Sequence, residues 1–260
     1  MPTALITGAS SGIGESFAKE LARRKYDLIL VARREDRLKA VAAAARELGA
    51  AQAEIAALDL SQPDAPRQLH KRLADNGREV ECLVNNAGFG TTGRFDRMPL
   101  EREIEEIELN VTALVTLTRL FLPAMIQRGR GTIINVASTA AFQAVPYMAT
   151  YAATKAFVLS FTEAIAAEAA GSGVHILALC PGPVRTEFQA VAKNEHGLMP
   201  SFAYTDADTV VRHALASAAR GRAVRISGVL NAITAQSTRF LPRALVRTLA
   251  ARIYRGVDGT

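Results

Sequence analysis

The chain has 260 residues, of which 49% are hydrophobic and 22% are charged, and this mixture excludes a disordered or fibrous protein. Its length suits one large α/β domain, and its two cysteines are too few for a disulfide framework or a four-cysteine metal site. The net charge of +6 originates in residues 209–260, which hold nine arginines and a single acid, whereas the first 208 residues sum to −2. No nucleic-acid-binding motif accompanies this basic region, so we expect no nucleic-acid partner.

The sequence predicts a cytoplasmic protein. No uninterrupted run of about 18 apolar residues is present, so no membrane-spanning segment is expected. Met1 leads directly into a candidate strand, without the basic start and apolar core of a secretory signal. Cys82 and Cys180 lie within predicted strands, where packing is the simplest role for them. The four histidines are dispersed without metal-ligand spacing, so we expect no metal site.

Short apolar runs alternate with longer helical patterns along the chain. The predicted strands are 3–7, 27–32, 54–58, 82–85, 131–137, 175–180 and 224–227. The predicted helices are 13–25, 34–48, 104–127, 149–170 and 206–219. Continuous apolar strands separated by helices indicate a parallel sheet covered on both faces. With right-handed crossovers, this pattern predicts a doubly wound, Rossmann-type α/β fold with strand order 3-2-1-4-5-6-7, in a single domain over 1–260.

The chemically unusual residues directly follow the strands. In an open α/β sheet, ligands bind beyond the carboxyl ends of the strands. The segments that follow the first six strands are, in order, 8–14, 33–34, 59–60, 85–88, 138 and 181–183. Because these ends meet at one edge of the sheet, the sequence predicts a single elongated site.

The glycine-rich loop after the first strand predicts a dinucleotide site. Gly8 and Gly12 allow the backbone to turn tightly and approach a pyrophosphate, and Gly14 permits close contact between helix and strand. Free N–H groups at the helix start then face the phosphates. An ordinary glycine-rich turn is the alternative. Arg33, which Arg34 and Arg37 could assist, stands where an acid would hold the adenosine ribose hydroxyl. An arginine there favours a 2′-phosphate, hence NADP(H) over NAD(H), and a solvated basic helix start is the alternative.

Tyr151 and Lys155 are four residues apart on a predicted helix and therefore share one face. A phenol with a pKa near 10 is a poor acid or base at neutral pH, and a neighbouring ammonium lowers that pKa. Ser138 can hydrogen-bond a substrate carbonyl. These residues predict acid–base chemistry, with an unremarkable surface Tyr–Lys pair as the alternative.

Six motifs together resemble the compact, classical branch of the short-chain dehydrogenase/reductase family. They are TGASSGIG at 7–14, NNAG at 85–88, ELNV with Asn110, NVAS with Ser138, YAATK at 151–155 and PGPVRT at 181–186. The resemblance covers about residues 3–228 in the family's order and spacing. It implies an NADP(H)-dependent oxidoreductase, a carbonyl or alcohol as substrate, and a homodimer or homotetramer.

The resemblance also implies a role for each matching residue. Tyr151 would exchange a proton with the carbonyl oxygen, Lys155 would lower the tyrosine pKa and hold the nicotinamide ribose, and Ser138 would orient the carbonyl. Asn110 would hold a water that relays protons to Lys155. The implied cofactor-binding residues are Gly8, Ser10, Ser11, Gly12, Ile13, Gly14, Arg33, Asp59, Leu60, Asn86, Ala87, Gly88, Tyr151, Lys155, Pro181, Gly182, Val184 and Thr186.

The substrate is constrained by two apolar segments. The predicted lid is 188–204 and a second wall is 142–148. The lid residues of interest are Phe188, His196, Met199, Phe202 and Tyr204. An apolar ketone, aldehyde, steroid-like or 3-oxoacyl substrate fits best, and YAATKAFVLSF resembles the hydroxysteroid and long-chain ketoacyl reductases of the family.

The tail at 236–256 predicts a basic amphipathic helix. Leu245, Leu249 and Ile253 recur every four residues, and Arg239, Arg243 and Arg247 recur at the same interval. We favour a helix that covers the core or a subunit contact, while an anionic membrane or an acidic partner stays possible. Two other function classes also stay open: a non-catalytic dinucleotide sensor that regulates a partner, and a membrane-recruited scaffold that uses this tail.

Overall fold

The computed structural model describes residues 1–184 and 204–254, and it contains one seven-stranded parallel sheet in the order β3-β2-β1-β4-β5-β6-β7. The strands are β1 (Thr3–Thr7), β2 (Asp27–Ala32), β3 (Ala53–Ala57), β4 (Cys82–Asn85), β5 (Gly131–Val136), β6 (Val174–Cys180) and β7 (Val224–Ile226). This order and the parallel pairing confirm the predicted fold class. The strands are apolar along nearly their whole length because helices bury both faces of the sheet.

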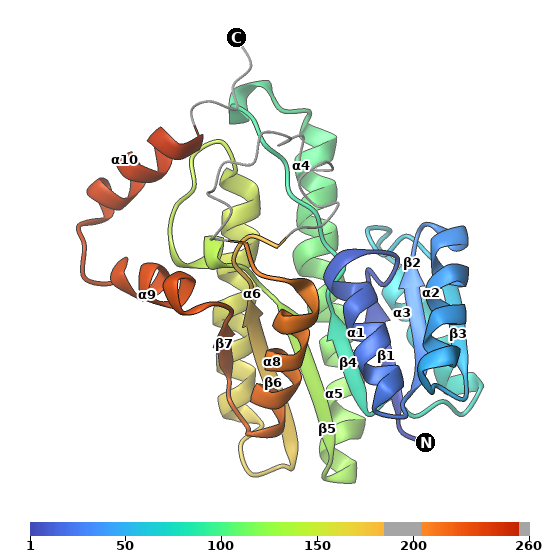
Figure 1. Cartoon of the computed structure of the whole chain (residues 1–260). Coiled ribbons are helices and arrows are strands. Elements are labelled where there is room, and N and C mark those ends of the chain that lie inside the picture. Colours follow the sequence, from blue (N-terminus) through green and yellow to red (C-terminus); the bar gives the residue numbers. More distant parts are fainter. Residues whose placement is uncertain (185–203, 255–260) are drawn as a thin grey trace.

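Helices cover the two faces in separate sets (Figure 1). On one face lie α1 (Gly12–Arg23), α2 (Glu35–Leu48) and α8 (Ala207–Ala219). On the other lie α3 (Ala65–Asp75), α5 (Leu114–Arg128) and α6 (Ala149–Glu168). Shorter elements are η1 (Phe95–Arg97), α4 (Leu100–Ile107), η2 (Glu108–Ala113) and η3 (Thr139–Phe142), and the chain closes with α9 (Val229–Ser237) and α10 (Arg243–Tyr254).

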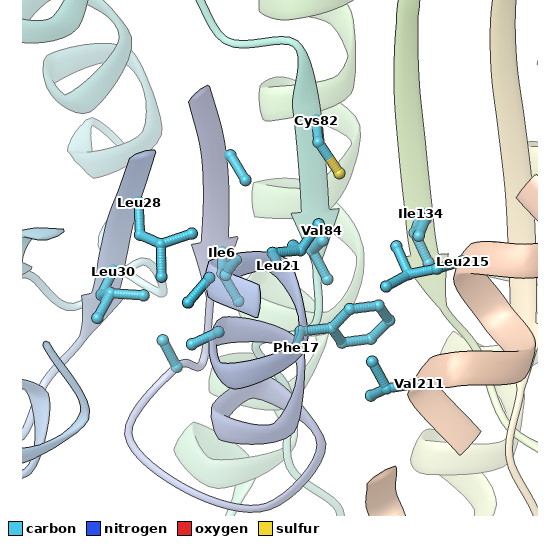
Figure 2. Packing of buried hydrophobic residues seen from close by; sticks show 14 of the residues in the cluster. Ile6, Phe17, Leu21, Leu28, Leu30, Cys82, Val84, Ile134, Val211 and Leu215 are labelled. Atoms are coloured by element: carbon cyan, nitrogen blue, oxygen red, sulfur yellow. The ribbon is translucent and has the colours of Figure 1, made fainter. Parts of the chain in front are cut away.

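The core of the first face shows how the helices are held to the sheet. Phe17 of α1 is fully buried and lies beside Val211 and Leu215 of α8 (Figure 2). Ile6 of β1 belongs to the same cluster. Burying a large apolar side chain of this kind stabilises the fold by about 1.5–3 kcal/mol. The core therefore fixes the strand ends relative to the helix starts, which is where the predicted site lies.

Two helical predictions need correction. Helix α3 was not predicted, although Ala65, Leu69 and Leu73 recur every four residues on its buried side. The residues between them are mostly polar or charged, so the apolar repeat is weak in the sequence. The helix predicted at 104–127 begins earlier, at Leu100, and its middle is a π-helical turn at η2. A π turn inserts one extra residue into a helix and commonly marks a functional position, and Asn110 lies within it.

The run Leu100–Arg128 also bears on the prediction that no segment spans a membrane. Within the described residues, this one helical run is long and apolar enough to do so by length and composition. However, Leu117, Phe121 and Met125 of its α5 portion belong to the buried core under the sheet. These contacts bury part of the run against the sheet, and 39% of its apolar stretch is buried. Both cysteines are buried, as their strand positions predict.

The tail forms helices, but its apolar row does not cover the core as expected. In α10, Leu245 is 46% exposed and Leu249 is 45% exposed, whereas Ala250 is buried. The side chain of Ile253 is outside the described residues. Helix α10 lies at the outside of the molecule, away from the sheet (Figure 1). The core-covering role is therefore wrong for Leu245 and Leu249, which leave an apolar surface open.

Candidate active site

The glycine loop and the loop after β4 are locked together at the end of β1. Asn86 donates from Nδ2 to the carbonyl oxygens of Thr7 (3.0 Å) and Gly8 (3.2 Å), and Thr7 Oγ1 accepts from the backbone N–H of Asn86 and Ala87. Gly8 has φ +64°, and a Cβ there would approach Ala87 Cα to 2.9 Å. Only glycine fits this combination of positive φ and close approach.

The basic residues after β2 lie beside this loop, and the two arginines make different contacts. Arg34 donates from Nη2 to the hydroxyls of Ser10 (3.2 Å) and Ser11 (2.9 Å). Arg33 instead faces acids: its Nη1 is 3.2 Å from Glu105 Oε1 and 3.8 Å from Asp59 Oδ2. Arg34 therefore contacts the glycine loop directly, whereas Arg33 lies between two acids beside it.

Lys155 is buried next to Tyr151 on α6, as the four-residue spacing predicts. Its Nζ donates to the carbonyl oxygen of Val136 at 2.9 Å and lies 5.8 Å from the centre of the Tyr151 ring. Burial lowers the pKa of Lys155 to about 8, and the charge of Glu106 opposes that shift. An amine of this kind can lose or hold a proton close to neutral pH, as an acid–base site requires.

Tyr151 and Ser138 are each held in place by the elements around them. Tyr151 packs with Val145, Met148 and Ala152, so the body of its ring is held in an apolar cluster. Ser138 follows β5 and caps η3, and its Oγ accepts from the N–H of Ala140 at 3.1 Å. A serine hydroxyl that accepts in this way keeps its own proton to donate.

Asn110 connects the π turn to this group. Its Oδ1 accepts from the N–H of Phe89 at 3.1 Å, and its Nδ2 donates to the Phe89 carbonyl and to Thr154 Oγ1. A Cβ at Gly88 would lie 2.7 Å from Asn110 Oδ1 and 3.4 Å from Lys155 Nζ. Gly88 therefore brings the loop after β4 into the space between the amide and the ammonium.

The remaining predicted residues line the same edge or fall outside the described part. Leu60 is buried in the core, and Asp59 accepts from Ser61. Val184 is buried and pairs with Thr205. Thr186 and most of the predicted lid, with Phe188, His196, Met199 and Phe202, lie outside the described residues. The roles assigned to individual residues stay predictions.

Several residues of the site were not found from the sequence. Glu103 and Glu106 of α4 are both buried, and Thr91 Oγ1 lies 2.9 Å from Glu103 Oε1 and 2.7 Å from Glu106 Oε2. Asn231 of α9 lies so close to Gly182 that a Cβ there would approach Asn231 Cγ to 2.6 Å. In sequence, the four glutamates of α4 resemble an ordinary solvent-exposed helix face. Only the packing therefore shows which two of them are buried.

A buried polar network supports the strands beneath the site. Asn85 donates from Nδ2 to Asn135 Oδ1 (2.9 Å) and Thr118 Oγ1 (3.0 Å), and Asn135 donates to Thr162 Oγ1 (3.0 Å). Asn85 and Asn135 pair directly across β4 and β5. The network ties the ends of both strands to α5 and α6, so Asn85 is structural while the next residue, Asn86, shapes the loop.

The residues present fit a dinucleotide. Gly8 and Gly12 both have positive φ, which opens the loop in front of the first turn of α1. The N-terminal N–H groups of α1 suit a phosphate, and Arg34 with Ser10 and Ser11 suits a further anion. Such a cofactor supplies hydride transfer when it is bound. The chain's own residues supply its placement and the proton.

Comparison with known proteins identifies the family. A family model described as short chain dehydrogenase matches residues 2–197. The chain is 32% identical over 245 residues to the very-long-chain 3-oxoacyl-CoA reductase of Rattus norvegicus, over 92% of this chain and 75% of that protein.

Two solved structures are similar over nearly the whole chain. A short-chain dehydrogenase from Sphingobium yanoikuyae in complex with NADPH has a TM-score of 0.84 and 35% identity, and covers 95% of both chains. A bulky-bulky ketone specific alcohol dehydrogenase from Comamonas testosteroni has a TM-score of 0.77 and 30% identity, and covers 92% of both. With the Rossmann-type sheet and the matched residues, these similarities show that the chain belongs to the short-chain dehydrogenase family of oxidoreductases.

Proposed function

We propose that the chain is an NADP(H)-dependent carbonyl reductase for apolar ketones or 3-oxoacyl thioesters. The observation that carries this proposal is the buried ammonium of Lys155 beside Tyr151, with Ser138 and Asn110 on the adjoining elements. Tyr151 would give a proton to the carbonyl oxygen while Ser138 orients that oxygen. Lys155 would stabilise the phenolate that remains, since a nearby ammonium favours a negative charge.

The cofactor preference is supported by Arg34. Its guanidinium, together with the hydroxyls of Ser10 and Ser11, forms a group that suits the 2′-phosphate of NADPH through charge-assisted hydrogen bonds. The similar protein from Sphingobium yanoikuyae was solved with NADPH. We expect Arg34→Ala to raise the KM for NADPH about tenfold and to leave the KM for NADH nearly unchanged. Arg24→Ala, at the far end of α1, is the matched control.

The substrate class is supported by the wall at 142–148 and by the relatives. Val145 and Met148 of this wall pack around Tyr151, so the surface next to the phenol is apolar. The similar proteins act, by their names, on 3-oxoacyl-CoA and on bulky ketones. A panel of medium and long 3-oxoacyl thioesters, steroids and aromatic ketones, followed by NADPH absorbance, tests the proposal. Turnover with none of them would favour a non-catalytic dinucleotide sensor.

The surface of α9 and α10 is proposed as a subunit contact. Val229, Ile233 and Phe240 are strongly exposed, and four arginines but no acid occur between residues 229 and 254. Light scattering after size exclusion should give a dimer or tetramer that becomes smaller after Phe240→Ser and Ile233→Ser. A monomer that sediments with anionic liposomes would instead support a membrane surface. A cytoplasmic location stays a prediction.

A further inference from the structure

One face of the helical run formed by α4 and η2 carries three buried polar residues. Glu103, Glu106 and Asn110 stand at positions i, i+3 and i+7, so their side chains share a face. That face packs against α6. Glu103 accepts a short hydrogen bond from the hydroxyl of Thr150, and Asn110 donates to the hydroxyl of Thr154 at 3.1 Å. Two contacts, one on each side of Glu106, therefore join the helices.

Glu106 lies at the level of the proposed catalytic pair. Thr150 and Thr154 each directly precede one member of that pair, Tyr151 and Lys155. Glu106 lies between the residues that contact the two threonines, so its carboxyl is placed between the two contacts. A residue at this place can act on the lysine without touching the substrate.

The hydrogen bonds around Glu106 do not satisfy it. Thr91 donates to Glu106 Oε2 from its backbone N–H at 3.0 Å, and its hydroxyl is within reach of both Glu106 and Glu103. That hydroxyl has one proton, so it donates to only one of the two carboxyls at a time. Glu106 is fully buried, and within the described residues its Oε1 has no hydrogen-bond partner. A buried carboxylate in this state needs a counter-charge or a proton of its own.

Lys155 is a buried cation whose charge acts on Glu106. Burial raises the pKa of Glu106 to about 7, and the hydrogen bonds from Thr91 and, to a smaller extent, the charge of Lys155 act against that rise. In return, the charge of Glu106 is the largest influence that keeps the proton on Lys155. Among the described residues, the other titratable groups that face the pair are Glu103, Tyr151 and Cys180. Burial raises the pKa of the Cys180 thiol to about 12, so it carries no charge near neutral pH.

We propose that Glu106 is a positioning residue of the reductase, whose buried carboxylate keeps the proton on Lys155 and thereby sets the pH range in which Tyr151 delivers its own proton. This inference rests on the proposed function and adds a residue to it. An uncharged side chain at position 106 would release the proton of Lys155 at lower pH. As the pH rises, kcat for reduction would then fall at a lower pH than in the unmodified protein, because Lys155 would already have lost its proton.

The test compares Glu106→Gln with Glu101→Gln, an exposed residue of the same helix. In steady-state reduction by NADPH, we expect the alkaline limb of the kcat profile of Glu106→Gln to move down by about one pH unit. The profile of Glu101→Gln should match that of the unmodified protein. Infrared spectra of the cofactor-free protein should show a carbonyl band of a buried carboxylic acid that titrates near neutral pH, and Glu106→Gln should lack it.

Two outcomes would overturn the inference. An unchanged alkaline limb in Glu106→Gln would do so, as would a carbonyl band that persists in this variant. If Glu106→Gln does not fold, Thr91→Val removes only the hydroxyl that supports the ionised carboxylate, and it should move the limb in the same direction by a smaller amount. An unmodified protein that reduces no carbonyl compound would refute the proposed function instead. The infrared measurement requires no turnover, so its result does not depend on that outcome.

Discussion

Replacing Lys155 by methionine removes a buried charge, and we expect the variant to be more stable than the unmodified protein at pH 6. The pKa of Lys155 falls from 10.5 to about 8 on folding, which corresponds to a cost of about 3 kcal/mol for the charged form. The lost hydrogen bond to the carbonyl of Val136 offsets about 1 kcal/mol of this. The net gain of about 2 kcal/mol corresponds to a rise in Tm of about 4–8 °C.

The pH dependence gives this prediction its sharpest test. Below pH 8 the lysine is charged in both the folded and the unfolded chain, so the whole cost is present. Between pH 8 and 10.5 the folded chain loses the proton and the unfolded chain keeps it, so the unmodified protein gains stability as pH rises. The advantage of Lys155→Met should therefore shrink across this window.

The assay is urea unfolding followed by circular dichroism at pH 6, 8 and 9.5. Lys71→Met is the control, because Lys71 is exposed and paired with Asp75, and its substitution should leave the stability nearly unchanged at each pH. A Lys155→Met protein that is less stable than the unmodified one at pH 6 would refute the reasoning. An advantage that does not vary with pH would refute it equally.

Two further substitutions test the geometry of the site and of the sheet beneath it. Gly88→Ala would bring a Cβ to 2.7 Å from Asn110 Oδ1, and because this displaces the amide, turnover should fall about 100-fold with little loss of Tm; wild-type kinetics would contradict this. Asn135→Leu would remove one buried hydrogen bond from each of Asn85 and Thr162, and should lower the free energy of unfolding by about 3 kcal/mol. A loss below about 1 kcal/mol in urea unfolding would show that the network is not stabilising.

The strand ends were predictable from the sequence because their chemistry is local. Gly8 has a positive φ, and a Cβ at Gly14 would approach the carbonyl oxygen of Gly8, so part of the need for glycine arises within one loop. The apolar strands before each motif fix which edge of the sheet it reaches. The spacing of Tyr151 and Lys155 likewise predicts a shared helix face. These features follow from short-range geometry, and the fold they imply is confirmed.

The buried acids were not predictable because burial depends on partners distant in the chain. Glu103 and Glu106 resemble their exposed neighbours in sequence, and only contact with Thr91 and Thr150 distinguishes them. Arg34 was expected to assist Arg33, but its two serine contacts, which cross from one strand end to the next, were not predictable. Such long-range pairs decide which of several similar side chains takes part in the site.

The most direct test of the account follows the transferred hydride with and without the hydroxyl of Tyr151. The purified protein is mixed with a 3-oxoacyl thioester or an aromatic ketone and NADPH deuterated at C4, and the alcohol is analysed by mass spectrometry. We predict deuterium at the carbinol carbon with the unmodified protein, and none with Tyr151→Phe, although that variant still binds NADPH. Deuterium transfer by Tyr151→Phe at the unmodified rate would contradict the central claim.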